Sequence, residues 1–256
     1  MRKIIIFLTG FLIFSEVSNA QYESRKAYAG ISVGPSIATG DFASKDVNFE
    51  PSGFAGTGIN LNLIFLYRIS SNFGFGAKLC IQTNPFDDKA LLAGLKKDGN
   101  TYGGQLSYTA VEANTWAMMS FMPGIFAAIP IGNRGKFILE PKANAGIMLG
   151  VSPYVKTSYR FNGFNYWEEQ ENGAGAGLGY GFGGTFRFNV NDHLALLLNG
   201  DYIKTKQKFI DVGYNYSNYN STLFSFQQTI ETVNVNIGIA IRFKKDAPPV
   251  RRNSIR

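Results

Sequence analysis

Cysteine and histidine are almost absent from this chain of 256 residues, which has one of each, Cys80 and His193. A single thiol cannot form an internal disulfide, so the fold must be held together by other means. One cysteine and one histidine, with no clustered ligand spacing, also give no basis for a metal site. No sequence signature of a cofactor is present either, and we expect none to be bound.

Long hydrophobic runs are also missing. After residue 20 no run approaches the ~18 apolar residues that a membrane-spanning helix needs, so any membrane crossing there must use the strands of a closed barrel. The first 20 residues differ, because Arg2 and Lys3 precede a short apolar stretch that ends at Ser18-Asn19-Ala20. This pattern is typical of a secretory signal peptide, and we interpret residues 1–20 as one that is cleaved.

The chain has little charge overall, and its net charge is +7. On an exported protein a modest positive balance indicates anionic surface lipid as a neighbour rather than nucleic acid. We therefore expect outer-membrane lipid as a partner and no nucleic acid. The size of the exported part fits one domain.

Residues 173–190 alternate between two kinds of side chain, with a break at Gly184. One parity carries Leu178, Tyr180, Phe182, Phe186 and Phe188, whereas the other carries glycines. The glycines of interest are Gly175, Gly177, Gly179, Gly181 and Gly183. A period of two is that of a strand, whose successive side chains point to opposite faces. A large apolar face opposite a bare one predicts a barrel with lipid outside and a polar lumen inside.

Eight segments show strand signals, and most alternate in the same way. We place them at about 26–38, 54–69 and 73–84, at a fourth segment ending near 129, at a fifth from 136, at the 173–190 segment, at a seventh from 193, and at 228–243. Short connections alternate with long ones, except where Asn162-Gly163 signals a tight hairpin. Long loops at one rim and short turns at the other are typical of outer-membrane barrels. The fold class is therefore all-β, an eight-stranded antiparallel up-and-down transmembrane β-barrel.

Three segments, AMMSFMPGIFAAIP, KFILEPKANAGIMLG and VNVNIGIAIRF, resemble those of the porin-like outer-membrane β-barrel domain family of Gram-negative envelopes. The resemblance covers essentially all of residues 21–243 and implies the bacterial outer membrane as the location. It implies little about activity, because its motifs are patterns rather than catalytic signatures. One departure is the basic tail, 244–256, which follows the last aromatic residue, Phe243, and which we expect to be disordered in the periplasm.

Charged residues on the inward faces are the first candidate site. They are Arg68, Lys78, Glu140, Lys142, Arg187, Asp201 and Arg242. They could form a polar conduit that favours anions, or a hydrogen-bonded ionic plug. The narrow interior of eight strands favours the plug, since side chains can just fill it. The glycine face of residues 175–183 complicates this view, because it predicts unfilled volume that holds water or receives large side chains from the fourth and seventh strands.

An enzyme of the membrane-embedded hydrolase type is the alternative with the weakest support. Such enzymes generally use histidine as a base, but His193 adjoins the Asn191-Asp192 turn at the rim opposite the long loops. The glycine ladder is not a phosphate loop, because it lacks the GKS or GKT ending and a following helix. We expect no enzyme activity.

The long loops are the remaining candidate surface, because aromatic side chains recur in recognition surfaces. Their aromatic residues are Tyr159, Phe161, Phe164, Tyr166, Trp167, Tyr214, Tyr216 and Tyr219. The same rings could instead pack on each other. Segment 87–98 is predicted to form a short amphipathic helix whose Lys96 and Lys97 meet lipid phosphates.

Together these features predict a monomeric outer-membrane barrel with a structural or surface-interaction role through its long loops. An extracellular protein or glycan is the expected kind of ligand. The alternatives are a narrow solute channel and an accessory component of a secretion or envelope-assembly machine.

Overall fold

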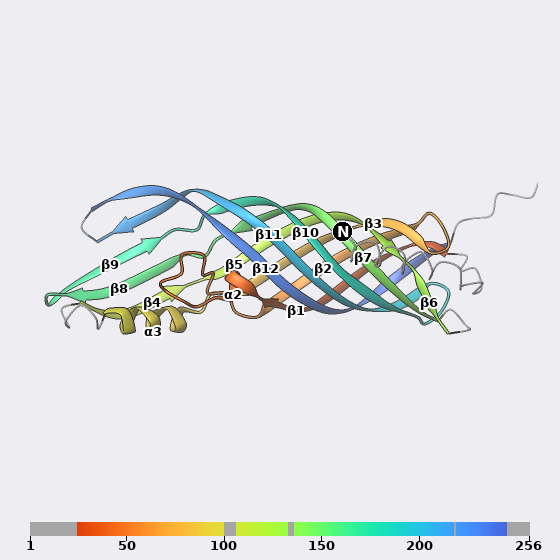
Figure 1. Ribbon diagram of the computed structural model, residues 1–256, viewed down its shortest axis with the longest axis horizontal. Helices are drawn as coiled ribbons and strands as arrows, with labels where there is room; N and C mark the ends of the chain where they lie inside the picture. Colours follow the sequence, from red (N-terminus) through yellow and green to blue (C-terminus); the bar gives the residue numbers. More distant parts are fainter. Residues whose placement is uncertain (1–24, 100–105, 133–135, 218, 245–256) are drawn as a thin grey trace, which may run out of the picture.

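A computed structural model describes residues 25–99, 106–132, 136–217 and 219–244 of the chain. The predicted signal peptide, residues 1–20, and nearly all of the predicted tail, 244–256, lie outside the described residues. Eight strands close a ring (Figure 1) in which every neighbouring pair is antiparallel. They are β1 (Arg25–Ala38), β2 (Gly58–Arg68), β3 (Phe73–Pro85), β5 (Thr115–Ala127), β7 (Phe137–Val151), β10 (Ala174–Asn189), β11 (Leu194–Tyr216) and β12 (Tyr219–Lys244).

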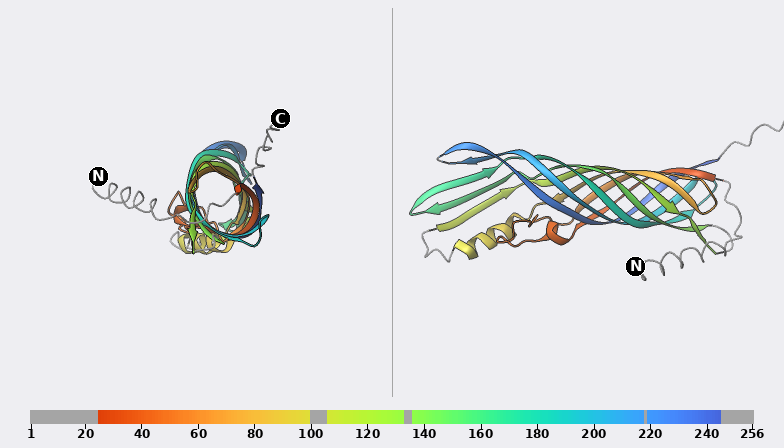
Figure 2. Two further views of the ribbon diagram at one scale, coloured as in Figure 1. Left: turned by 90° about the vertical axis from the view of Figure 1, so that its right-hand side faces the viewer. Right: turned by 45° about the horizontal axis from the view of Figure 1, so that its top comes forward.

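The ring follows chain order and closes by pairing of the first strand with the last, so it is an up-and-down barrel. The register of β1 on β12 places Tyr28 opposite Arg242 and Ile37 opposite Val233. Seen along its axis, the ribbon forms a closed circle (Figure 2). The predicted fold class is confirmed, because the eight strands leave no unpaired edge.

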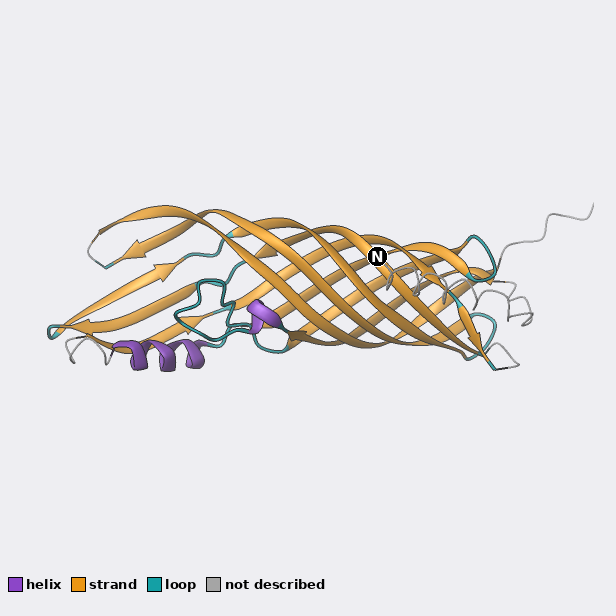
Figure 3. Ribbon diagram, viewed as in Figure 1, coloured by secondary structure: helices purple, strands orange, loops and turns teal. Residues whose placement is uncertain are grey.

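All the other elements except β6 lie at one end of the barrel. One of them, α2 (Gly40–Ala43), belongs to a segment that covers the barrel mouth. The others are α3 (Asp88–Gly99), β4 (Leu106–Ala113), β8 (Val155–Phe161) and β9 (Phe164–Gln170). Together with residues 209–217 and 219–227 of the long β11–β12 hairpin, we call these four elements the crown, which projects past the ring in Figure 3. The opposite end, with tight turns at 69–72 and 190–193 and the short strand β6 (Ile129–Ile131), is the turn rim.

Alternating strands put apolar side chains on the outside of the ring. In β2 the exposed residues Ile59, Leu61, Leu63 and Phe65 alternate with buried ones. The same holds for Leu178, Tyr180 and Phe182 in β10 and for Val235, Ile237 and Ile239 in β12. A soluble monomer rarely exposes so large an apolar surface. The outward belt is that of a barrel that crosses a bilayer.

Aromatic side chains concentrate at the edge of this belt that is nearest the turn rim. Phe137 packs on Phe188 with ring centroids 4.9 Å apart, and Tyr67 lies 5.6 Å from Phe75. Aromatic rings at this level form the interfacial girdle of membrane barrels. Among the described residues neither helix is long and apolar enough to cross a membrane.

Three expectations about the strands need correction. The second strand begins at Gly58 rather than at Phe54, because residues 54–57 belong to a loop that folds over the barrel mouth. The connection between the seventh and eighth predicted strands is not a long loop, because β11 and β12 continue as a paired hairpin up to the Tyr216–Tyr219 pair. The crown also contains one strand that was not predicted, β4, which pairs with β8 of the predicted β8–β9 hairpin, and β9 pairs with the outer part of β11.

The Asn162-Gly163 hairpin signal is confirmed by the pairing of Phe161 with Phe164. Both turn residues have positive φ, 48° and 86°, which is the geometry of a type I′ turn and explains why asparagine and glycine stand there. The predicted helix at 87–98 is also confirmed as α3.

Candidate functional site

The seven charged residues predicted to face the lumen are all buried, each with at most 8% of its surface exposed. Asp201 lies at the centre of one group, with Lys78 Nζ and Lys142 Nζ at 3.2 and 3.1 Å from its two carboxylate oxygens. The strands that supply these residues, β3, β7 and β11, are far apart in sequence, and the ring brings their inward faces together. A buried carboxylate between two ammonium groups offsets the cost of burying them.

This group continues through neutral side chains. Lys142 donates to Thr185 Oγ1 at 3.2 Å, and Thr185 donates in turn to Asn199 at 2.6 Å. All of these side chains are buried. Sequence reasoning missed Thr185 and Asn199, although both share the inward parity of their strands.

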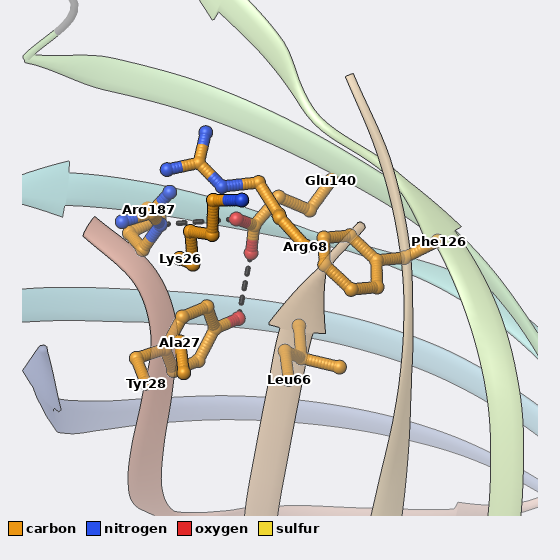
Figure 4. Close-up of a pocket in the computed structure, with 8 residues that line it drawn as sticks. All are labelled: Lys26, Ala27, Tyr28, Leu66, Arg68, Phe126, Glu140 and Arg187. Atoms are coloured by element: carbon orange, nitrogen blue, oxygen red, sulfur yellow. Dashed lines mark hydrogen bonds and ion pairs between the residues drawn. The ribbon is translucent and has the colours of Figure 1, made fainter. Parts of the chain in front are cut away.

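A second group lies nearer the turn rim and is centred on Glu140 (Figure 4). Arg187 Nε lies 3.0 Å from Glu140 Oε1, and the Tyr28 hydroxyl donates to the other oxygen at 2.6 Å. The Arg187 guanidinium also lies 5.1 Å above the Tyr28 ring. Arg68 lines the same small cavity, whose volume of about 10 Å³ is at most that of one water molecule.

The turn rim is closed by one further contact of this kind. Arg242 Nη1 donates to the backbone oxygen of Asn191 at 2.9 Å, in the turn that precedes His193. The His193 backbone N–H donates to the Asn191 side chain, so this segment has the hydrogen bonding of an Asx turn.

The glycine face is not the open wall that the sequence suggested. A Cβ atom on Gly175 would lie 2.6 Å from the Phe209 ring, and one on Gly183 would lie 2.6 Å from Asp201 Oδ1. On Gly177 and Gly179 it would meet Thr205, and on Gly181 it would lie 3.7 Å from Met122 Cε. The side chains of Phe209 and Met122, from β11 and β5, therefore extend into the space that the glycines leave, which is the second of the two outcomes expected from the sequence.

Above the charged groups the lumen is filled with apolar side chains. A cluster of buried residues includes Met118, Met122, Met148, Ile203, Phe209 and Ile230. Buried polar atoms of Ser32, Asn62 and Ser120 have no accessible surface and no hydrogen-bond partner among the described residues. The surrounding side chains therefore close these atoms off from bulk solvent in this conformation.

The mouth of the barrel is covered by residues 39–57, which we call the cap. Phe42, from α2, is fully buried and packs edge-on against Trp116, with ring centroids 5.5 Å apart. Trp116 Nε1 donates to the backbone oxygen of Gly53 at 3.0 Å. The cap is therefore joined to the strand wall by both packing and a buried hydrogen bond.

A pocket of about 400 Å³ lies between the cap and the crown. Two aromatic groups line it, the Phe54–Phe86 pair, stacked at 5.5 Å, and a row formed by Tyr214, Phe224 and Phe226. Its polar lining residues are Glu50, Ser52, Thr157, Glu168, Gln170, Ser225 and Gln228. This crown pocket has the size and mixed lining of a small-ligand site, and its only charged lining residues are two carboxylates.

The loop aromatics predicted from sequence fall into two places. Tyr214 lines the crown pocket, whereas Phe161 and Phe164 are exposed at the tip of the β8–β9 hairpin. Tyr159 stacks on Tyr166 at 5.7 Å, Lys156 Nζ lies 5.1 Å above the Trp167 ring, and Tyr216 packs on Tyr214. Tyr219 is described only by its backbone pairing with Tyr216. Sequence reasoning missed Phe54, Phe86 and Trp116, because these belong to the cap and to the ends of β3 and β5.

Tyrosine hydroxyls hold the carboxylates of the crown. Glu168 accepts from Tyr159 at 3.1 Å and from Tyr214 at 2.8 Å, and Glu169 accepts from Tyr154 at 2.9 Å. Burial first, and then the neighbouring carboxylate, raises the pKa of Tyr154 and of Tyr159 to about 12. The pKa of Tyr214 is raised for the same reasons. These phenols stay protonated and donating at physiological pH.

Replacing Glu168 with Gln is expected to lower the pKa of Tyr159 from about 12 towards the ordinary value of ~10. The amide removes the charge that disfavours the phenolate. Because the pKa of Tyr159 is raised in the folded state, protonated Tyr159 stabilises the folded protein fully below the unfolded pKa, and this stabilisation is lost as pH rises through about 12. Tyrosine absorbance followed as a function of pH measures the pKa of Tyr159. Glu171→Gln is the matched control, because Glu171 accepts from Asn215, and an unchanged titration in Glu168→Gln would contradict the assignment.

Within the described residues no group of three or more histidines, cysteines or carboxylates could hold a metal ion. His193 lies in the β10–β11 turn at the turn rim, whereas the crown pocket lies at the opposite end of the barrel. The residues that line the crown pocket include no histidine and no cysteine.

The chain matches no protein-family model, and a search of curated proteins returned no significant match. Among solved structures it is similar to Ail, the attachment invasion locus protein of Yersinia pestis, with 12% identity, a TM-score of 0.42 and coverage of 86% of this chain and 99% of Ail. It is also similar to the outer membrane protein OprG from Pseudomonas aeruginosa, with 14% identity, a TM-score of 0.44 and coverage of 88% of this chain and 100% of OprG.

A major outer membrane protein from Thermus thermophilus gives 11% identity, a TM-score of 0.45 and coverage of 85% and 99%. A further structure is Ail in complex with the heparin analogue sucrose octasulfate. At these identities and scores we draw no functional argument from the likeness. The chain is similar to small outer-membrane β-barrel proteins, and its own closed ring of eight strands establishes its fold.

Proposed function

We propose that this protein is an outer-membrane β-barrel that does not conduct solutes and that recognises a ligand outside the cell through its crown. The observation that carries the proposal is the crown pocket standing above a lumen filled by side chains. The Glu140 and Asp201 groups fill the lower lumen, and the methionine and phenylalanine cluster fills the upper part. A filled lumen favours the ionic plug over the conduit.

The chemistry of the pocket indicates the class of ligand. Two aromatic walls offer stacking surfaces, and side-chain amides and hydroxyls between them offer hydrogen bonds. The charged lining residues are Glu50 and Glu168, so polyanions are disfavoured. A neutral or cationic ligand with an apolar face, such as a saccharide ring or an aromatic peptide side chain, fits this lining.

The proposal is tested by binding of the full-length protein in lipid nanodiscs to an array of neutral, cationic and sulfated saccharides and short peptides. Neutral or cationic members are expected to bind, and sucrose octasulfate is not. Phe86→Ala and Phe224→Ala, one in each aromatic group of the pocket, are each expected to weaken binding about tenfold, which is ~1.4 kcal/mol. Phe161→Ala with Phe164→Ala removes two exposed rings outside the pocket and serves as the control.

Conductance across planar bilayers supplies the opposing outcome. Wild-type protein is expected to insert without single-channel steps. Reproducible steps, together with no ligand in any class, would favour the solute channel instead. Stable co-purification with a periplasmic partner at the turn rim would favour an accessory role in envelope assembly.

A further inference from the structure

We propose that three outward-facing lysines of β11, which are Lys204, Lys206 and Lys208, bind the phosphate groups of a phosphorylated lipid in the outer leaflet. The inference rests on the outer-membrane placement proposed above and is independent of the crown ligand. It concerns the outer wall of the barrel, whereas the crown pocket lies inside its mouth.

The lysines stand where the apolar belt of β11 ends. Towards the turn rim the same face carries Leu196 and Leu198, which are 46% and 50% exposed. Tyr202 then marks the boundary, and the lysines follow it at every second position. The neighbouring β12 changes at the same level, because Glu231 and not an apolar residue is paired with Lys204. Tyrosine at a boundary with lysines beyond it is typical of a membrane–water interface.

Their spacing suits a ligand with more than one phosphate oxygen. Alternate residues of a strand share a face and lie ~6.6 Å apart, so the ammonium groups form a row. Lys206 and Lys208 are exposed, whereas the intervening Thr205 and Gln207 are buried in the lumen. Lys204 is held by Glu231, with Nζ 2.5 Å from its carboxylate. Within the described part of the chain no carboxylate forms an ion pair with the other two lysines.

An apolar surface lies directly beside the row. The pairing of Lys204 with Tyr180 and of Lys208 with Ala176 places Leu178 next to Lys206. Leu178 is 80% exposed and Tyr180 is 52% exposed, on the lipid-facing side of β10. A lipid whose phosphate lies on the lysines would therefore place its acyl chains against Leu178 and Tyr180. This combination of lysines and apolar surface favours a lipid headgroup over free phosphate, because free phosphate cannot contact the apolar surface favourably.

The test is a titration of the full-length protein in neutral detergent with diphosphorylated lipid A, followed by native mass spectrometry. Saturable binding is expected, and Lys206→Glu with Lys208→Glu is expected to weaken it at least tenfold. Dephosphorylated lipid A should bind at least tenfold more weakly than the phosphorylated form, and added salt should weaken binding because the contacts are exposed. Inorganic phosphate alone should not compete at equal concentration.

Lys89→Glu with Lys136→Glu makes the same charge change at two exposed lysines outside β11 and should leave binding unchanged. Equal loss in both double variants, or competition by inorganic phosphate, would overturn the β11 site. Heat-modifiable gel migration and crown-ligand binding of the β11 variant are followed in parallel. If both are retained while lipid A affinity does not change, this inference fails and the proposed function stands; if the wild type does not insert into a bilayer, the proposed function fails first.

Discussion

Replacing Asp201 with alanine is expected to lower the free energy of unfolding by about 3–5 kcal/mol, the usual cost of leaving buried charges without their partner. Lys78 and Lys142 lie 3.2 and 3.1 Å from the Asp201 carboxylate, and both side chains are at most 5% exposed. Without Asp201 two ammonium groups would face each other in the lumen. Reversible urea unfolding in lipid vesicles, followed by tryptophan fluorescence, measures the change.

Two further variants separate charge from packing. Glu231→Ala removes an acidic partner of a lysine on the outer wall, where Lys204 is 38% exposed, and is expected to cost about 1 kcal/mol or less. Lys78→Met, Lys142→Met and Asp201→Leu together replace the whole group by apolar side chains and should recover most of the stability. If the free energy of unfolding of Asp201→Ala lies within about 1 kcal/mol of the wild-type value, the ionic plug contributes little to stability.

The alternation of apolar and polar residues was sufficient to predict the ring and the inward charges. Parity alone places Leu178 outside and Arg187 inside, because side chains on a strand point to opposite faces. Parity does not say which inward residues meet. Lys78 and Asp201 are 123 positions apart, and their contact depends on the register of the whole ring, which no single strand encodes.

The same limit applies to the glycine face. The glycines of residues 175–183 predicted space for water or for large side chains of the fourth and seventh strands, but a strand taken alone cannot show that Phe209 and Met122 are the side chains that enter it. The long β11–β12 hairpin of the crown was missed for a different reason. Residues 209–227 are rich in asparagine, serine and tyrosine, which is typical of a loop, yet the pairing of β11 with β12 satisfies their backbone groups. Phe209 and Val212 of this segment also belong to the buried apolar cluster. The cap has the sequence of a loop, and its position over the barrel mouth depends on the contact between Phe42 and Trp116, which are far apart in sequence.

Replacing Phe42 with alanine is expected to release the cap from the barrel mouth. The ring is fully buried and packs against Trp116 at 5.5 Å, and losing a buried phenylalanine costs about 3–5 kcal/mol. That cost falls on the cap, because the eight-stranded ring does not depend on it. In a Trp167→Phe background, which leaves Trp116 as the reporter, tryptophan emission should shift to the red and become quenchable by acrylamide.

Phe49→Ala is the matched control, because Phe49 belongs to the same cap but is 43% exposed, and it should leave the Trp116 emission unchanged. Crown-ligand affinity should fall with Phe42→Ala, since Glu50, Ser52 and Phe54 supply one side of the pocket from the cap. Heat-modifiable gel migration should persist, because the inter-strand hydrogen bonds of the ring are untouched. Unchanged Trp116 emission in Phe42→Ala would mean that the Trp116 Nε1–Gly53 hydrogen bond and the backbone contacts hold the cap without the ring of Phe42. A red shift accompanied by loss of heat-modifiable migration would mean instead that the cap stabilises the barrel wall itself. The two measurements together therefore show whether the Phe42–Trp116 contact stabilises only the cap or also the ring of eight strands.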